Sequence, residues 1–254
     1  YATLAAAINA ASANDELVLL NNITEDVTIS KSLTIDGANF EYTGNISVSG
    51  TSTKATVKKV NFVDGTGYAI TTNRINTITV EDCTVANYGF GFLYANKSTP
   101  TVTVKNVTVE NANYGLHWVY GTTATLENVT MTNVTNGLYI QNYAGKTINV
   151  KGCNISSIAI WERENESGVQ TFNFTGENTV ASLADSQYAK YVLAATDATL
   201  TAPEGSTVIV TTELENQGYV VEYNEGVYSV VAGNVLNSTT GKKYATLQAA
   251  IDDA

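Results

Sequence analysis

Hydrophobic and polar residues alternate along most of the chain, in short segments that recur at a nearly constant spacing. In the segment 77–85, apolar Ile78, Val80 and Val85 fall on one side of an extended chain and polar residues fall on the other. This period of two is typical of a strand with one buried face. Five segments share the template: VKKVNFVD (57–64), VEDCTVAN (80–87), VKNVTVEN (104–111), LENVTMTN (126–133) and VKGCNISS (150–157). Their starts are 23, 24, 22 and 24 residues apart, and the same frame extends back to Ile35 and forward to Phe172.

A second, looser apolar block follows the template in most repeats. It reads GYAIT (67–71), GFLY (91–94), GLHW (115–118), GLYI (137–140) and AIWE (159–162). One repeat cannot bury its apolar face alone, but repeats stacked at ~4.8 Å make a continuous interior. The pattern therefore predicts an all-β solenoid, a parallel β-helix of about seven coils.

Aligned template positions predict columns that run along the solenoid. Two columns are expected to be interior: Val57, Val80, Val104, Leu126 and Val150, and Phe62, Val85, Val109, Met131 and Ile155. A third column, Asp64, Asn87, Asn111 and Asn133, is expected at a turn, because Asn and Asp tolerate a left-handed backbone. A fourth, outward column alternates in charge through Lys58, Glu81, Lys105, Glu127 and Lys151. Alternation gives each side chain an opposite neighbour and opposes slipped stacking.

The two cysteines occupy the same template position in different coils. Cys83 and Cys153 share this position with Val60, Val107 and Val129. Three coils would hold the cysteines roughly 14 Å apart, whereas a disulfide needs Cα atoms within about 7 Å. We expect both thiols to be reduced and buried.

The residues on either side of the coils predict caps and a domain order. Thr3 is placed to cap a helix with an apolar stripe of Leu4, Ala7, Ile8 and Ala11, so residues 1–12 are expected to form a cap helix. Coils are expected over 13–185, and residues 186–231 are expected to be irregular before a hairpin at 218–231 with an Asn-Glu-Gly turn. A linker is expected at 232–243. YATLQAAIDDA (244–254) repeats YATLAAAINAA (1–11) at eight of eleven positions, which predicts the start of the next tandem module.

Several of these motifs resemble a known family. YATLQAAIDDA, TEDVTISKSLTIDGANF (24–40) and the VKNVTVEN-type coils are similar to the pectate-lyase-like β-helix modules repeated in large bacterial cell-surface and adhesin-like proteins. The resemblance implies a right-handed, single-stranded parallel β-helix with an extracellular location at the cell surface. It also implies that neighbouring tandem modules of the same polypeptide are partners. A shared fold does not transfer activity.

Charge and composition narrow the classes of partner. Apolar residues make up 44% of the chain and charged residues 15%, which is typical of a folded protein. The net charge of −11 repels nucleic acid and anionic lipid. No run of residues approaches the roughly 18 apolar residues of a membrane span. We therefore expect neither nucleic-acid binding nor membrane insertion. A surface module of the resembled kind would instead have a glycan, or a host or cell-surface ligand, as its partner.

The resemblance also implies an enzyme as an alternative, because relatives of the resembled fold include polysaccharide lyases and polygalacturonases. The coils lack paired Asp-Asp, Asn-Thr-Asp and Gly-His-Gly, and His117 is the only histidine, so no metal site and no cofactor are expected. The weak catalytic candidates are Glu162 and Glu164, which on one strand face would lie roughly 7 Å apart, within inverting glycosidase geometry. A solvated turn explains these residues equally well.

The second block predicts a surface for ligand binding. If Phe92 and Tyr94, Leu116 and Trp118, and Leu138 and Ile140 face inward, then Leu93, His117, Tyr139 and, by looser alignment, Trp161 form an outward row. Aromatic faces with polar edges suit sugar rings. Flanked by Tyr143, Glu162 and Arg163, this row is a candidate glycan platform. The alternative is that Tyr139 and Trp161 merely lie under a neighbouring loop.

Threonines form a further outward pattern. Thr77 and Thr79, Thr101 and Thr103, and Thr123 and Thr125 are followed by Thr147 and Asn149. This pattern resembles the ladders of β-solenoid ice-binding proteins, although Thr is also a good exposed strand residue. The sequence as a whole predicts a non-catalytic extracellular stalk or adhesin module with glycan binding. The alternative is a carbohydrate-active enzyme, a polysaccharide lyase or glycoside hydrolase.

Overall fold

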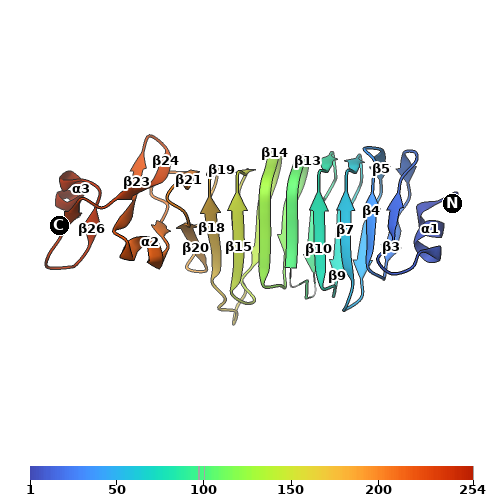
Figure 1. The fold of residues 1–254 in the computed structure, drawn as a ribbon, viewed down its shortest axis with the longest axis horizontal. Coiled ribbons are helices and arrows are strands. Elements are labelled where there is room, and N and C mark those ends of the chain that lie inside the picture. Colours follow the sequence, from blue (N-terminus) through green and yellow to red (C-terminus); the bar gives the residue numbers. More distant parts are fainter. Residues whose placement is uncertain (97, 100, 254) are drawn as a thin grey trace.

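The computed structural model describes residues 1–96, 98–99 and 101–253, and it shows short strands stacked in coils along one long axis (Figure 1). Consecutive coils pair in parallel, which makes a β-helix of about eight turns. Helix α1 (Leu4–Ala10) lies at one end of the axis, and a hairpin of β23 (Tyr219–Asn224) and β24 (Val227–Ala232) lies towards the other. Among the described residues, no helix is long and apolar enough to cross a membrane.

The strands of the coils fall into three parallel ladders, named A, B and C here. Ladder A contains β1 (Glu16–Val18), β4 (Leu33–Asp36), β7 (Lys54–Lys58), β10 (Thr77–Glu81), β15 (Lys146–Lys151), β18 (Gln170–Thr175), β20 (Ala189–Leu193) and β22 (Val208–Val210). Ladder B contains β2 (Ile23–Thr24), β5 (Glu41–Thr43), β8 (Asn61–Val63), β11 (Thr84–Ala86), β16 (Asn154–Ile155), β19 (Glu177–Val180) and β21 (Thr199–Thr201). Ladder C contains β3 (Val27–Ile29), β6 (Ile46–Ser49), β9 (Tyr68–Asn73), β12 (Gly91–Asn96) and β17 (Ile158–Trp161). The long strands β13 (Thr101–Trp118) and β14 (Thr123–Gln141) pass through all three ladders.

The pairing register confirms the predicted interior columns. Val57 pairs with Val80, and Val80 pairs with Val104 in the next coil. Every member of both predicted interior columns is buried. Cys83 and Cys153 are buried free thiols, as predicted, and burial raises the pKa of the Cys83 thiol to about 12.

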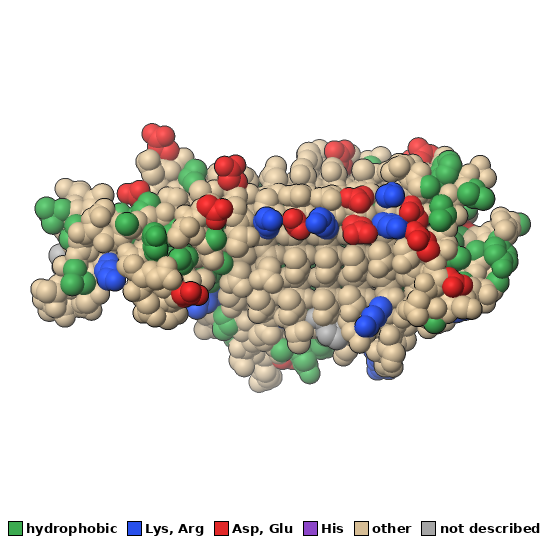
Figure 2. Space-filling view, in the orientation of Figure 1, with side chains coloured by type: hydrophobic (Ala, Val, Ile, Leu, Met, Phe, Trp, Pro, Cys, Tyr) green, Lys and Arg blue, Asp and Glu red, His purple; other side chains and the backbone are tan. Residues whose placement is uncertain are grey.

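The charged column is also confirmed. Lys105 pairs with Glu81 on one side and Glu127 on the other, and Glu127 pairs with Lys151. The Glu127 carboxylate lies 3.3 Å from Lys105 Nζ and 3.4 Å from Lys151 Nζ, and these two lysines lower its pKa. Figure 2 shows the resulting line of alternating basic and acidic side chains along the outside of ladder A.

Asparagine side chains join the coils at two turns. The predicted turn column adopts a left-handed backbone, with φ of 59° at Asn87 and 54° at Asn111. The Asn111 amide donates to Asn87 Oδ1 at 3.0 Å, and the Asn133 amide donates to Asn111 Oδ1 at 3.1 Å. A second column of this kind, which the sequence pattern did not reveal, runs through Asp82, Asn106 and Asn128.

The last coils differ from the sequence-based expectation in two ways. Val150 pairs with Phe174 rather than Phe172, so the frame predicted for that coil is wrong by two residues. Both phenylalanines are buried, and a period of two does not distinguish them. The segment 187–203, expected to be irregular, contains β20 and β21, which stack in parallel on β18 and β19. Regular stacking therefore extends beyond residue 185, because Tyr191 and Leu193 still face the core although the template letters are lost.

Both ends of the solenoid are covered. The Thr3 hydroxyl accepts from the Ala6 amide at 3.1 Å, and α1 buries Leu4 and Ile8, as predicted. At the other end, β24 pairs antiparallel with β21, and the predicted hairpin turns at Glu225 and Gly226. Helix α2 (Thr212–Asn216) precedes this hairpin.

The predicted linker is partly structured. Within 232–243, β25 (Val235–Leu236) pairs antiparallel with β26 (Lys243–Tyr244), and α3 (Leu247–Asp252) follows. The predicted start of a further module, 244–254, thus forms a strand and a helix, and Ala254 lies outside the described residues.

Candidate functional site

Seven ring side chains form a continuous surface on the outside of ladder C, called the aromatic row below. It consists of Phe90, Tyr68, Tyr94, Tyr114, His117, Tyr139 and Trp161. Each ring contacts at least one other, and the shortest centroid distance is 4.6 Å, between Tyr94 and His117. All seven side chains are partly or largely exposed. The row crosses five consecutive coils of the solenoid.

The pairing register of ladder C brings the side chains at the centre of the aromatic row into line. Tyr94 pairs with His117, and His117 pairs with Tyr139, so three rings stand one coil apart. In the following coil Ala159 lies opposite Tyr139. The small alanine side chain leaves room for Trp161, whose ring stacks on Tyr139 with centroids 6.1 Å apart and planes inclined by 23°.

Gly91 permits a contact between rings from coils two apart. Gly91 pairs with Tyr68 on one side and Tyr114 on the other, and it places no side chain between them. The rings of Tyr68 and Tyr114 therefore approach to 6.1 Å. A Cβ atom at position 91 would lie only 2.1 Å from the Tyr114 carbonyl oxygen, so no larger residue fits without displacement of the backbone.

His117 is a neutral ring at the centre of the row. Its Nδ1 atom lies 2.9 Å from the Tyr68 hydroxyl, within hydrogen-bond distance. Burial lowers the pKa of His117 to about 4, so the imidazole is uncharged at neutral pH. Among the described residues, Nε2 has no hydrogen-bond partner and is shielded from solvent. His117 thus contributes a flat, weakly polar surface rather than a positive charge.

The predicted outward row is correct for His117 and Tyr139 and wrong for Leu93. Leu93 is 0% exposed and pairs with Leu116 in the interior, whereas Tyr94, expected inside, faces outward. The cause is a turn that is longer by one residue: Leu93 follows Asn87 by six positions, whereas Leu116 follows Asn111 by five. The extra residue lies between Asn87 and Gly91, because Gly91 pairs with Tyr114 and Leu93 pairs with Leu116. Phe92, between Gly91 and Leu93, is also buried.

Trp161 joins the row from a different position than predicted. Its pairing partner is Gln141 rather than Tyr139, so the looser alignment is wrong by two residues. The side chain nonetheless reaches Tyr139 and is 39% exposed. Neither Tyr139 nor Trp161 is covered completely, so both can meet a ligand.

Two predicted flanking residues lie at the edges of the row. The Arg163 guanidinium lies 5.8 Å from the Trp161 ring, and the Arg163 backbone amide donates to Asn142 Oδ1 at 3.0 Å. Tyr143 packs edge-on against Tyr120, with ring centroids 4.5 Å apart. Arg163 therefore extends the Trp161 end of the row, and Tyr143 belongs to a neighbouring pair of rings.

The weak catalytic candidates occupy a loop. Strand β17 ends at Trp161, so the expectation that Glu162 and Glu164 share a strand face is wrong. Both side chains are exposed, and the Glu162 carboxylate accepts a hydrogen bond from the Ser186 hydroxyl. A general acid of a glycosidase usually needs an apolar enclosure, which this loop does not provide. Within the described part of the chain, no group of three or more His, Cys, Asp or Glu is placed to hold a metal ion.

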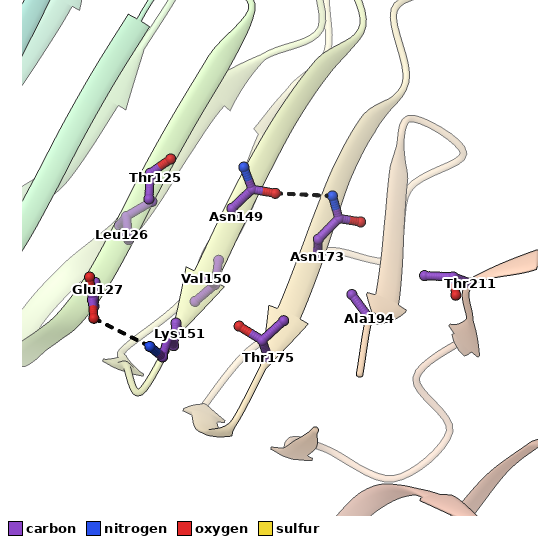
Figure 3. A pocket seen from close by; sticks show the side chains of 10 residues that line it. All are labelled: Thr125, Leu126, Glu127, Asn149, Val150, Lys151, Asn173, Thr175, Ala194 and Thr211. Carbon is purple, nitrogen blue, oxygen red and sulfur yellow. Dashed lines mark hydrogen bonds and ion pairs between the residues drawn. The ribbon is translucent and has the colours of Figure 1, made fainter. Parts of the chain in front are cut away.

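A shallow pocket lies on a different side of the solenoid, on the outside of ladder A (Figure 3). It has a volume of about 360 Å³, and it lies where the predicted threonine columns continue as Asn149 and Asn173. Four of its polar side chains interact in pairs: the Asn173 amide donates to Asn149 Oδ1 at 3.2 Å, and Lys151 forms an ion pair with Glu127. The aromatic row, which exposes ring faces, is the better candidate for ligand recognition.

Four members of the row were missed from the sequence: Tyr68, Phe90, Tyr94 and Tyr114. Tyr68, Phe90 and Tyr114 precede or begin the second apolar block of their coils. This recurrence of aromatic residues at the entry to ladder C was a usable signal. Alignment of the blocks on their glycines concealed it.

Comparison with known proteins supports the fold. A family model described as right handed beta helix region matches residues 14–128, from the first coil into β14. No curated protein and no solved structure matches the chain. The matched segment contains the Tyr68, Phe90, Tyr94, Tyr114 and His117 members of the aromatic row. The family model and the stacked parallel coils together identify the chain as a right-handed parallel β-helix.

Proposed function

We propose that this protein is a non-catalytic extracellular module of a bacterial surface protein, of the stalk or adhesin type, and that it binds glycans through the aromatic row. The observation that carries the proposal is the unbroken line of ring contacts from Phe90 to Trp161 on the solvent side of ladder C. A solenoid needs apolar residues inside for its stability. Aromatic rings gathered outside are typical of an interaction surface.

The chemistry of the row matches that of sugar rings. Pyranose rings present apolar C–H faces and hydroxyl edges, and Tyr and Trp present apolar faces with a polar group at the rim. Five coils at a spacing of ~4.8 Å give the row a length of roughly 19 Å, which favours a chain of several sugar units over a single one.

Charge favours a neutral glycan. The chain carries a net charge of −11, and no side chain of the row is charged at neutral pH. The Arg163 guanidinium beside Trp161 is the positive group that contacts the row among the described residues. A polyanionic glycan would meet this single cation and an otherwise acidic protein, so a neutral polysaccharide is the preferred ligand class.

Binding to a glycan array tests the proposal. The wild type, Tyr139→Ala and Trp161→Ala should be compared, with Tyr1→Ala as control because Tyr1 is an exposed aromatic residue outside the row. We expect the two row variants to lose binding with little change in the thermal midpoint, and the control to bind like the wild type. Row variants that bind as well as the wild type would overturn the proposal. Release of shortened or unsaturated products from a bound glycan would instead favour the carbohydrate-active enzyme.

A further inference from the structure

Helix α3 has an apolar face that the described residues leave uncovered. Leu247 is 64% exposed and Ile251 is 58% exposed. In the near-identical sequence at the other end of the chain, Leu4 is 4% exposed and Ile8 is 3% exposed. Both helices begin in the same way, because the Thr246 hydroxyl accepts from the Ala249 amide as the Thr3 hydroxyl accepts from the Ala6 amide. The difference between the helices is therefore what lies against them.

The surface beneath α1 is built to receive such a helix. Leu4 and Ile8 close the end of the core beside β3. The backbone amide of Leu4 donates to Glu25 Oε1 at 2.6 Å, and Lys31 Nζ donates to the Ala11 carbonyl at 2.7 Å. A carboxylate at the start of the helix and an ammonium group at its end complement the helix dipole.

The two ends of the chain are complementary in a second respect. Tyr244 is 7% exposed and pairs in β26 with Val235 of β25. Tyr1, at the corresponding position before α1, is 87% exposed. Within the described part of the chain, the end with α1 thus has a coil on which the helix packs, but no strand like β25 beside Tyr1. The end with α3 has such a strand beside Tyr244, but no described coil on which its helix packs.

We propose that α3 is the cap helix of a second copy of this fold. It packs on Glu25, Lys31 and β3 of that copy in the way that α1 packs on the same residues of its own chain. Successive modules then join head to tail through the β25–β26 hairpin. Helices α1 and α3 lie at opposite ends of the long axis, so the joint extends the solenoid lengthwise (Figure 1). The inference does not depend on glycan binding.

A seamless fusion tests the joint. Ala254 aligns with Ala11, so residues 1–254 followed directly by residues 12–254 place α3 where the second copy needs its cap. Hydrogen exchange of residues 247–252 should be measured in the 254-residue chain and in the fusion. We expect these amides to exchange at least about tenfold more slowly in the fusion. Equal exchange in the two proteins would overturn the proposal.

Substitution of the helix face provides an independent arm. Leu247→Ser with Ile251→Ser should lower the unfolding temperature of the second copy in the fusion and leave that of the 254-residue chain unchanged. Val169→Ser is the matched control, because Val169 is an exposed apolar residue far along the chain from both helices. No effect of the double substitution in the fusion would contradict the proposal. A stable dimer of the 254-residue chain that the double substitution dissociates would show that α3 serves a different contact.

Discussion

The Tyr68 hydroxyl lies 2.9 Å from His117 Nδ1, although 49 residues separate the two in sequence. They belong to coils two apart, and in the coil between them Gly91 pairs with Tyr68 and places no side chain against its ring. The aromatic row thus depends on one residue without a side chain as well as on its rings.

The pH dependence of folding should report on His117. Its pKa is about 4 in the folded protein and about 6.5 in an unfolded chain, so the unfolded state binds more protons between these values. The stability that the neutral ring contributes is fully present above pH 6.5 and is lost as the pH falls towards 4. The thermal midpoint of the wild type should therefore fall more steeply over this range than that of His117→Gln. Tyr68→Phe should retain the steep dependence, and parallel curves for wild type and His117→Gln would refute the assignment.

Replacement of Gly91 should disturb the row and its strand. In Gly91→Ala the new Cβ atom meets the Tyr114 carbonyl oxygen at 2.1 Å, and such overpacking costs about 1–3 kcal/mol. Gly67→Ala is the control, because a Cβ atom there meets nothing within 4 Å. Chemical denaturation should show a lower free energy of unfolding for Gly91→Ala but not for Gly67→Ala. Similar stabilities of the two variants would mean that the close approach at Gly91 is absent.

The charged column can be tested by a double-mutant cycle. Lys105→Glu places a carboxylate between Glu81 and Glu127 and removes the 3.3 Å ion pair with Glu127. The side chains are partly exposed, so we expect a loss of about 0.5–1 kcal/mol in the free energy of unfolding. Adding Glu127→Lys should recover part of this loss. The recovered part of the free energy of unfolding should be smaller in high salt. Strict additivity of the two substitutions would show that they do not interact.

Two substitutions in the asparagine column should separate the effect of backbone strain from the effect of lost hydrogen bonds. Asn111 has a φ of 54° and is hydrogen-bonded to Asn87 and Asn133. Asn111→Ala and Asn111→Gly lose the same amide bonds, but only glycine adopts this backbone without strain, as Gly152 does with a φ of 63° in the other column. We expect the alanine variant to be less stable than the glycine variant by about 0.5–1 kcal/mol, after the greater flexibility of unfolded glycine is allowed for. Urea titration of both variants provides the comparison, and a more stable alanine variant would be inconsistent with the left-handed turn.

The coil, its interior columns and its caps were predictable from the order of the amino acids alone. A solenoid repeats one environment in every turn, so Val57, Val80 and Val104 report the same buried position three times. The charges of Lys105 and Glu127 supply an independent check, because stacked neighbours favour opposite signs. Helix α1 was predictable from local signals alone, namely the Thr3 cap and the spacing of Leu4 and Ile8.

The register of ladder C, and therefore the membership of the aromatic row, is established only in the folded chain. Alternation of polar and apolar residues establishes which positions share a face, but a turn longer by one residue reverses the faces. The extra residue before Gly91 placed Leu93 inside, paired with Leu116, and Tyr94 outside, paired with His117. The contact between the rings of Tyr68 and Tyr114 likewise spans two coils and depends on the absence of a side chain at Gly91, which no local pattern contains.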